Sequence, residues 1–318
     1  RFYVEKCEAM RNFANKIWNA SRFVQMNLSI ETCALPAAKE MAAEDKWVLS
    51  RLNTLVKEVT ENLESFEIGV ASAKVYDFLW DTYCDWYIEL TKTRLNGEDE
   101  AAKLVAQNVL CYVLTQLLKL LHPFMPFLTE EIYQALPRIE GDESILMVSR
   151  WPEYDEALNF PAEEASIDAV MDVIRAIRAR RAEMNVPPSK KAEVLLVTAT
   201  PEIYQQGLHF LQRLAYASEV RFADAAPANA AGQVSVVTHN ATAYMPLSEL
   251  VDLAAERERV AKEMEKARNG LRITEGKLSN EKFVAHAPEN VVNAEREKVT
   301  KYQELIAKLE ASAKSLEG

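Results

Sequence analysis

Residues 101–133, AAKLVAQNVLCYVLTQLLKLLHPFMPFLTEEIY, decide the fold of this chain. The stretch Ala101–Leu121 is apolar on nearly every side, which is typical of a helix surrounded by other helices. His122 stands where this helix must stop, because Pro123 biases the residue before it away from helical conformation. We therefore expect His122 to be a structural residue that caps the helix, followed by a short last helix over Thr129–Leu136.

Three further helices are predicted around this central one, over Phe2–Leu28, Asp45–Phe66 and Glu67–Leu95. Asn96-Gly97 ends the third of them. Residues 1–136 therefore read as a helical bundle. Residues 137–165 contain three prolines and a glycine, and we interpret them as a linker with Trp151 as its packing anchor.

Residues 166–247 are predicted to form a small α/β unit. Its first helix carries an isoleucine and valine stripe at helical spacing, and a second helix is expected over Glu202–Ala217. His239-Asn240 can turn a hairpin between two of its strands. Strands are expected over Glu193–Val197, Glu219–Phe222, Val234–Thr238 and Ala241–Met245.

Residues 248–318 have the pattern of a coiled coil, because apolar residues step by three and four from Leu250 to Leu278 and again from Val292 to Leu316. Residues 280–288 interrupt the pattern. Two helices of similar length joined by a short loop favour an antiparallel hairpin within one chain over an oligomer-forming coiled coil. The predicted fold class is therefore mainly α: a helical bundle, a small α/β unit and a C-terminal antiparallel coiled-coil hairpin.

Composition limits the functions that this chain can have. The formal net charge is −11, so the surface as a whole repels nucleic acid, and any role in binding RNA must rest on local basic faces. The four cysteines are far apart in sequence, which argues against a zinc ribbon or a redox motif and for reduced thiols in the cytoplasm. We expect no transmembrane helix and no signal peptide. The chain starts at Arg1 within a predicted helix, which suggests a fragment.

Motifs of catalysis are sparse. The sequence has no Gly-rich phosphate loop, no Gly-x-Ser-x-Gly and no His-Glu-x-x-His. Glu130 and Glu131 are adjacent on a predicted helix and therefore point about 100° apart. Of the three functions that we consider for this chain, an enzyme that uses these two carboxylates with His122 has the least support. We predict no catalytic residue and no metal site.

The first predicted helix has a face with the chemistry of RNA recognition. An apolar stripe including Met10 lies on one side, and the opposite side carries Trp18 among arginines and asparagines; two residues lie on the border between the faces. Guanidinium groups pair with phosphates, amides read base edges and rings stack on bases. The sequence of this helix alone fits a second interpretation equally well, in which the charged groups are solvated and Trp18 packs on a neighbouring domain. The candidate residues are Arg11, Asn15, Asn19 and Arg22, with Lys16 and Phe23 at the border.

Two other basic groups are candidates, but solvated charge explains each of them at least as well. Arg175 and Arg178 line one edge of the helix that opens the α/β unit. The first hairpin helix carries several arginines and lysines, but its glutamates almost cancel them, as is normal on coiled-coil flanks.

The order of motifs resembles a known family. RNFANKIWNASRF (11–23), CDWYIELTK (84–92), LLHPFMPFLTEEIY (120–133), IRAIRARRAEMNVPPSKK (174–191) and KLSNEKFVAHAPENVV (277–292) are similar to the C-terminal half of the valyl-tRNA synthetases over nearly the whole chain. The middle motifs are shared loosely with isoleucyl and leucyl enzymes, whereas the hairpin is valyl-type. The resemblance implies an anticodon-binding bundle and a hairpin that reaches the tRNA elbow.

The resemblance also assigns candidate residues and partners. It favours RNA contact for the first helix and adds Lys92 and Arg94 as weaker candidates, while Arg268, Arg272 and Lys277 are candidates for the elbow. The implied partners are valine tRNA and the missing catalytic half of the same polypeptide, and the implied state is a cytoplasmic monomer. The family's two catalytic signature motifs and its editing domain are absent, so this chain alone would bind tRNA without cofactor, while the whole enzyme would use ATP and Mg²⁺ to join valine to tRNA.

A protein-interaction module is the competing hypothesis. In that case the seam residues Val260, Met264 and Ile306 would face another chain instead of the second helix of the hairpin.

Overall fold

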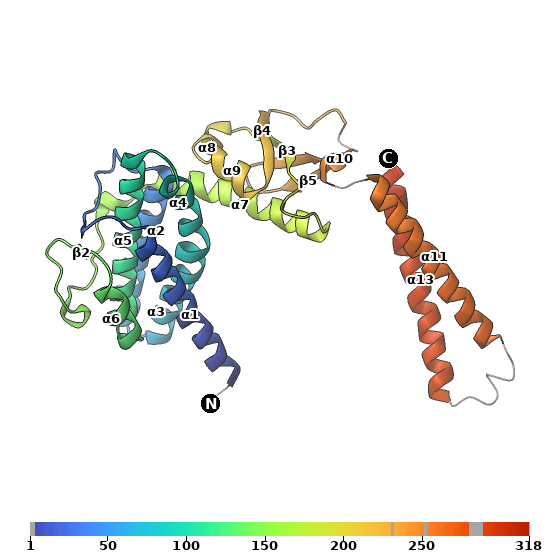
Figure 1. The fold of residues 1–318 in the computed structure, drawn as a ribbon, viewed down its shortest axis with the longest axis horizontal. Coiled ribbons are helices and arrows are strands. Elements are labelled where there is room, and N and C mark those ends of the chain that lie inside the picture. Colours follow the sequence, from blue (N-terminus) through green and yellow to red (C-terminus); the bar gives the residue numbers. More distant parts are fainter. Residues whose placement is uncertain (1–3, 230–231, 251–252, 280–288, 318) are drawn as a thin grey trace. The chain divides into compact units, whose positions relative to one another are not determined.

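The computed structural model describes residues 4–229, 232–250, 253–279 and 289–317, and the chain divides into two compact units (Figure 1). The first unit comprises residues 1–171 and 202–210, and the second comprises residues 172–201 and 211–318. Helix α7 (Pro161–Glu183) runs from the first unit into the second.

Four long helical segments of alternating direction make the bundle of the first unit (Figure 1). They are α1 (Val4–Asn27), α2 (Ala43–Glu64), the continuous run α3 (Ile68–Asp77), η1 (Phe78–Tyr87) and α4 (Ile88–Leu95), and α5 (Glu100–Leu121). Because the segments alternate, the start of α1, the α2–α3 turn and the end of α5 lie at the same end of the bundle. The predicted four-helix organisation is confirmed, with boundaries shifted by one or two residues.

Helix α5 is the central helix, as its sequence predicts. The Asp99 side chain caps its start by accepting from the N–H groups of Ala101 and Ala102 at 3.0 Å. The helix is long and apolar enough to cross a membrane, which differs from our expectation, but 83% of its apolar stretch is buried inside the protein. Its composition therefore follows from its central position among the other helices.

The third helical segment is not a regular α-helix throughout. In η1 the hydrogen bonds span five residues, so the Ile88 N–H donates to the Tyr83 carbonyl. Tyr83 is fully buried, and its hydroxyl donates to the Leu110 carbonyl of α5 at 3.0 Å. Apolar spacing predicts a single helix here and does not reveal the wider π-helical turn.

His122 makes a structural contact at the corner after α5, but its backbone stays helical (φ −54°, ψ −40°), contrary to the effect predicted for Pro123, and its ring Nε2 is buried without a partner. Its ring Nδ1 lies 2.8 Å from the Thr129 hydroxyl, and its backbone N–H closes the last turn on Leu118. The predicted start of the next helix at Thr129 is wrong. Helix α6 (Pro126–Gln134) begins three residues earlier, because Pro126 suits the first turn, where its missing N–H needs no partner.

The predicted linker is wrong for most of its length, because residues 138–160 pack along the bundle. Strand β2 (Arg138–Ile139) pairs in parallel with β1 (Thr32–Cys33), and two short 3₁₀ turns follow, η2 (Leu146–Val148) and η3 (Glu156–Leu158). Lys119 and Asp142 form a buried ion pair at 2.7 Å. The Trp151 indole N–H donates to the Thr60 hydroxyl at 2.9 Å, as a packing anchor should. The composition of this stretch shows its prolines, but it does not predict the ion pair and the hydrogen bond that hold the stretch on the bundle.

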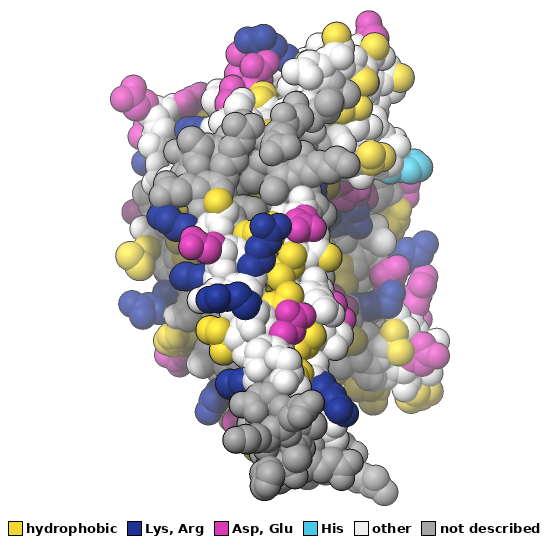
Figure 2. All heavy atoms as spheres, turned by 90° about the vertical axis from the view of Figure 1, so that its right-hand side faces the viewer, with side chains coloured by type: hydrophobic (Ala, Val, Ile, Leu, Met, Phe, Trp, Pro, Cys, Tyr) yellow, Lys and Arg dark blue, Asp and Glu magenta, His cyan; other side chains and the backbone are white. Residues whose placement is uncertain are grey.

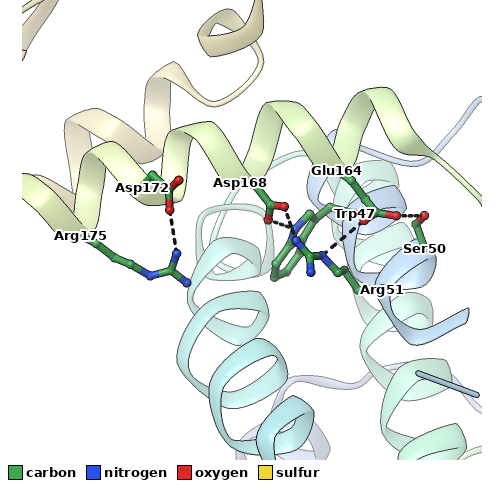
Figure 3. Close-up of polar contacts among 7 residues, drawn as sticks. All are labelled: Trp47, Ser50, Arg51, Glu164, Asp168, Asp172 and Arg175. Carbon is green, nitrogen blue, oxygen red and sulfur yellow. Dashed lines mark hydrogen bonds and ion pairs between the residues drawn. The ribbon is translucent and has the colours of Figure 1, made fainter. Parts of the chain in front are cut away.

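Polar side chains attach α2 to the start of α7 (Figure 3). The Trp47 indole N–H donates to Asp168 at 2.9 Å, the Ser50 hydroxyl donates to Glu164, and the Arg51 guanidinium pairs with both carboxylates. Helix α7 therefore begins as part of the bundle unit, five residues before the predicted start of the α/β unit at 166.

The predicted helix Glu202–Ala217 is two helices, α8 (Pro201–Gln205) and α9 (Leu208–Leu214). The break lies at Gly207, where a Cβ atom would stand 2.6 Å from a methyl group of Val170 in α7. The Ser166 hydroxyl of α7 donates to the Ile203 carbonyl at 2.5 Å. Close packing on α7 therefore interrupts the helix.

The second unit contains the predicted sheet, in the order β4-β3-β6-β5. Strand β3 pairs in parallel with β4 and antiparallel with β6, and β5 and β6 form the hairpin that His239-Asn240 predicts. Alternate residues of β3 are buried, which is the pattern of a half-covered sheet. The strands are β3 (Ala192–Val197), β4 (Ala217–Ala223), β5 (Gln233–Val237) and β6 (Thr242–Pro246), followed by the short helix α10 (Leu247–Leu250).

Helices α11 (Leu253–Leu278) and α13 (Glu289–Glu317) form the predicted antiparallel hairpin. Ala267 and Leu309 are buried in its seam, with Met264, Tyr302 and Ile306 packed against them. A Cβ atom on Gly270 would stand 2.6 Å from the Tyr302 ring, so the ring packs directly on the glycine backbone there. The predicted loop 280–288 and the side chain of Val260 lie outside the described residues.

Candidate nucleic-acid interface

A groove of about 480 Å³ lies between α1 and the η1–α4 segment of the bundle. It brings together side chains that are up to 80 residues apart in sequence. Five of the eight candidates predicted for the anticodon region line it. The lining residues are Asn12, Asn15, Lys16, Asn19, Ala20 and Phe23 from α1 and Cys84, Ile88 and Lys92 from the facing segment.

Helix α1 presents the groove because its other side is fixed in the core. Phe13, Ile17 and Val24 are buried, as the apolar stripe predicts, whereas Met10 of the same stripe is 51% exposed. The predicted polar face is exposed throughout, and Trp18 is exposed among these residues. That face carries Arg11, Asn15, Asn19 and Arg22.

Lys16 is held against one wall of the groove. Its ammonium group pairs with Asp85 at 2.7 Å and lies 3.8 Å from the centre of the Trp80 ring. Both contacts fix the long side chain in one direction. Because Asp85 is exposed, a phosphate can replace this carboxylate at small cost.

An aromatic ring and a second cation stand side by side in the same groove. The Lys92 ammonium is 5.6 Å from the Phe23 ring centre and is bonded to Glu89. Burial raises the pKa of the neighbouring Cys84 thiol to about 12, so this side chain carries no charge at neutral pH. The groove therefore offers amides, a ring and two ammonium groups on a partly apolar floor.

Arg94 is not part of this groove, although it is only two residues from Lys92. Its side chain is 15% exposed and donates to both oxygens of Asp45, at 2.6 and 2.7 Å, while Glu44 pairs with it at 2.8 Å. The Tyr87 hydroxyl also donates to Asp45 at 2.6 Å. Arg94 is thus committed to the fold, a role that periodicity does not predict.

The basic residues of the α/β unit are also engaged within the protein. Arg175 pairs with Asp172 one turn earlier on α7, at 3.1 Å (Figure 3). Arg178 Nε donates to the Leu214 carbonyl at 2.6 Å and its guanidinium lies 5.8 Å from the Tyr216 ring. Arg178 therefore stabilises the unit, although both Arg175 and Arg178 are exposed.

The three hairpin candidates are exposed and make weak contacts. Arg268 pairs with Glu310 across the hairpin at 2.9 Å, Arg272 donates to Asn269 at 3.0 Å, and Lys277 lies 3.6 Å from Glu295. Figure 2 shows Lys and Arg side chains along the hairpin, with acidic side chains interspersed between them. Exposed pairs contribute only about 0–1 kcal/mol, so these cations can be redirected to a phosphate.

The third hypothesis, an enzyme based on His122 and its acidic neighbours, gains no support from the geometry. Glu130 accepts from the Leu146 N–H at 3.0 Å and from Gln134 at 2.5 Å, and Glu131 points to solvent. Among the residues that the structure describes, no three His, Cys, Asp or Glu side chains are grouped to hold a metal ion.

Comparison with known proteins identifies both helical parts. Residues 45–196 match the model of the anticodon-binding domain of tRNA ligases, and residues 252–317 match the model of the tRNA-binding arm of valyl-tRNA synthetases. The chain belongs to the valyl-tRNA synthetase family. The bundle unit thus carries an anticodon-binding domain, and the hairpin is the tRNA-binding arm of this family.

Curated valyl-type relatives match nearly the whole chain. The valine--tRNA ligase of Clostridium acetobutylicum is 49% identical over 98% of the chain, that of Clostridium perfringens 48% over 96%, and that of Carboxydothermus hydrogenoformans 43% over 95%. The chain spans only 34–35% of the length of these relatives.

Four of the residues that line the groove were not predicted from the sequence, although helical spacing could have indicated most of them. Asn12 lies one helical turn before Asn15 and Lys16, so the same helical wheel could have included it. Cys84 and Ile88 precede Lys92 at spacings of four on the facing segment. What the sequence could not show is which segment faces α1.

Proposed function

We propose that this chain is the tRNA-binding portion of a valine--tRNA ligase whose α1–η1 groove holds bases of the anticodon region. The observation that carries the proposal is the meeting of amides, the Phe23 ring and the Lys16 and Lys92 ammonium groups in one groove. Unstacked bases of RNA loops bind to such sets of groups by stacking and edge hydrogen bonds. Arg11 and Arg22 flank the groove on α1, where they would contact phosphates.

The hairpin supplies a second contact in this proposal. Arg268, Arg272 and Lys277 would meet phosphates at the elbow of the tRNA, on the arm whose family model is a tRNA-binding one. Two modest contacts on one molecule act together, because the first raises the effective concentration for the second. Valine tRNA is the proposed partner, since the relatives are valine--tRNA ligases.

The complete protein, in this proposal, joins valine to its tRNA with ATP and Mg²⁺ in a catalytic body beyond this chain. The chain itself binds tRNA and catalyses no step. It acts in the cytoplasm as a monomer.

The groove is tested by titrating the chain with valine tRNA and with an isoleucine tRNA. Phe23→Ala should weaken binding of valine tRNA by about 1–3 kcal/mol, which is the contribution of stacking one base on an aromatic ring. Met26→Ala changes an exposed residue on the same helix that is not a groove residue and serves as the matched control. Equal binding of both tRNAs, or no loss with Phe23→Ala, would argue against base recognition in this groove.

The phosphate contacts are tested by the salt dependence of the same titration. Arg22→Gln should weaken binding of both tRNAs alike and reduce the slope of log K against log salt by roughly one contact's share, ~0.7–0.9. Lys39→Gln, an exposed cation before α2, is the control and should leave the slope unchanged. Removing residues 251–318 should weaken binding further; unchanged affinity would remove the arm from the interface.

Self-association is the second candidate function, and the hairpin argues against it. Met264 and Ile306, which would face a second chain, pack on Ala267 and Leu309 within one hairpin. Sedimentation equilibrium should give a mass independent of concentration. A mass that rises with concentration would favour the oligomer.

A further inference from the structure

One end of the bundle exposes large apolar side chains that the proposed tRNA contacts do not use. Phe127 at the start of α6 is 91% exposed and Phe66 in the α2–α3 turn is 88% exposed. Ile68, two residues after Phe66, is also exposed. Met147 lies on the η2 segment, which packs on α6, and its side chain is exposed as well. The up-and-down order of the helices places these turns at the same end as the first described turn of α1 (Figure 1).

Phe66 stands in a conformation that its side chain disfavours. Its φ of 59° is left-handed, a region that glycine adopts freely and a bulky residue adopts at a cost. The turn is a helix C-terminal motif in which the Glu67 N–H donates to Asn62 at 2.8 Å and the Phe66 N–H to Leu63 at 3.1 Å, so glycine is the usual residue here. A strained backbone that carries a solvent-exposed ring points to a contact outside this chain.

The charge around this end favours protein over RNA. Glu61, Glu64 and Glu67, which are exposed, lie within five residues of Phe66 in the chain, and the exposed Glu131 lies one helical turn from Phe127. Phosphates would be repelled by these groups. An apolar protein surface with a basic rim fits both the rings and their surroundings.

We propose that this apolar end, formed by Phe66, Ile68, Phe127 and Met147, is the docking face for the remaining two-thirds of a full-length valine--tRNA ligase polypeptide. The chain spans only 34–36% of the length of its relatives, so the relatives contain a large protein body that this chain lacks. The inference rests on the proposed function. It assigns the face to protein, while the groove on α1 is left for tRNA.

Hydroxyl-radical footprinting with mass spectrometry tests the face without any substitution. The oxidation rates of Phe66, Phe127 and Met147 are compared between the 318-residue chain and the full-length polypeptide that contains it, both without tRNA. We expect at least a fivefold decrease at these residues in the full-length protein. Met26, 80% exposed near the other end of α1, is the control and should oxidise at the same rate in both.

The other outcomes overturn the proposal. Equal rates in both proteins mean that the face is free. Protection of Phe66 and Phe127 in the 318-residue chain on adding valine tRNA makes it an RNA surface, and protection that appears on concentrating the chain makes it a contact between copies. Failure of tRNA binding to this chain would affect the proposed function but not the rates measured without tRNA.

A substitution separates docking from folding. Phe66→Gly removes the ring and suits the left-handed backbone, so the isolated chain should melt at an unchanged or higher temperature. In the full-length protein the same change should increase the oxidation rate of Phe127 at least twofold, because the interface loosens. A lower melting temperature of the isolated chain together with an unchanged Phe127 rate would show that Phe66 serves this fold alone.

Discussion

The bundle and the hairpin are both antiparallel helical assemblies, but they treat their charged side chains in opposite ways. In the bundle, Arg94 is enclosed by Asp45 and Glu44, and Lys119 by Asp142. In the hairpin, Arg268 and Glu310 pair in solvent. A buried cation that is paired with buried carboxylates holds the fold together, whereas an exposed cation remains available to a ligand. Burial, more than charge, therefore separates structural basic residues from candidate RNA contacts.

The sharpest contrast comes from removing the acidic partner of one arginine in each region. Asp45→Ala leaves Arg94 and the Tyr87 hydroxyl without their main acceptor inside the bundle, and it should lower the free energy of unfolding by about 3–5 kcal/mol. Glu310→Ala should cost under about 1 kcal/mol. Urea unfolding followed by circular dichroism measures both. Similar losses for the two variants would break the comparison.

The buried charges should also make the bundle sensitive to pH. Burial raises the pKa of Glu44 from 4.5 to about 7, outweighing the attraction of Arg94. A carboxyl group with a raised pKa in the folded state contributes stability below pH 4.5 that is lost as pH rises through 7. The wild-type chain should therefore lose stability relative to Glu44→Gln between pH 4.5 and 7, on the order of 3 kcal/mol.

Urea midpoints of the two proteins across this pH range provide the measurement. Glu310→Gln, which alters an exposed carboxylate, is the control and should show no such divergence from wild type. Parallel curves for wild type and Glu44→Gln would mean that Glu44 is already ionised in the folded protein.

The hairpin is more sensitive to shape than to charge. Gly270→Leu inserts a side chain where Tyr302 already stands, and it should destabilise the two-helix contact by about 1–3 kcal/mol. At Gly276 on the same helix a Cβ atom would meet no atom within 4 Å, so Gly276→Leu is the matched control. Hydrogen exchange of amides in α11 and α13 should rise for the first variant only, with the bundle unchanged in both. Faster exchange in the bundle would mean that the two regions unfold together.

The smallest effect is expected at the α5–α6 corner. His122→Ala removes one hydrogen bond to Thr129, whose hydroxyl still donates to the Met125 carbonyl at 2.9 Å, so the loss should be about 1 kcal/mol. Urea unfolding measures the loss, and tRNA titration should show no change in affinity. A variant of full stability that no longer binds tRNA would contradict the structural assignment.

Periodicity predicted most helices, the four main strands and the hairpin seam, because each depends on residues close in sequence. Buried Ala267, Leu309 and Val292 fall on the predicted seam positions. The errors arose where distant residues decide. Helix α6 begins at Pro126, and residues 138–160 are held by Lys119 and Thr60, neither of which belongs to the local pattern.

The candidate site shows the same limit. A helical wheel places Asn15 and Asn19 on the outward face of α1 and Phe23 at the border of that face, but it cannot find the opposite wall of the groove. It also cannot separate Lys92 from Arg94, since only the fold reveals that Asp45 lies beside Arg94. Local sequence gives candidate residues, and tertiary contacts decide which of them remain free.

The π-helical segment η1 has a consequence for the groove wall. In an α-helix of 3.6 residues per turn, two residues four positions apart are separated by slightly more than one full turn. In the wider π-helix, where hydrogen bonds span five residues, they are separated by slightly less than one full turn. The step from Cys84 to Ile88 lies at the end of η1 and the step from Ile88 to Lys92 lies in α4, so the two deviations offset and the three side chains stay in line. The number of residues in this one segment therefore sets the register between the two walls of the groove.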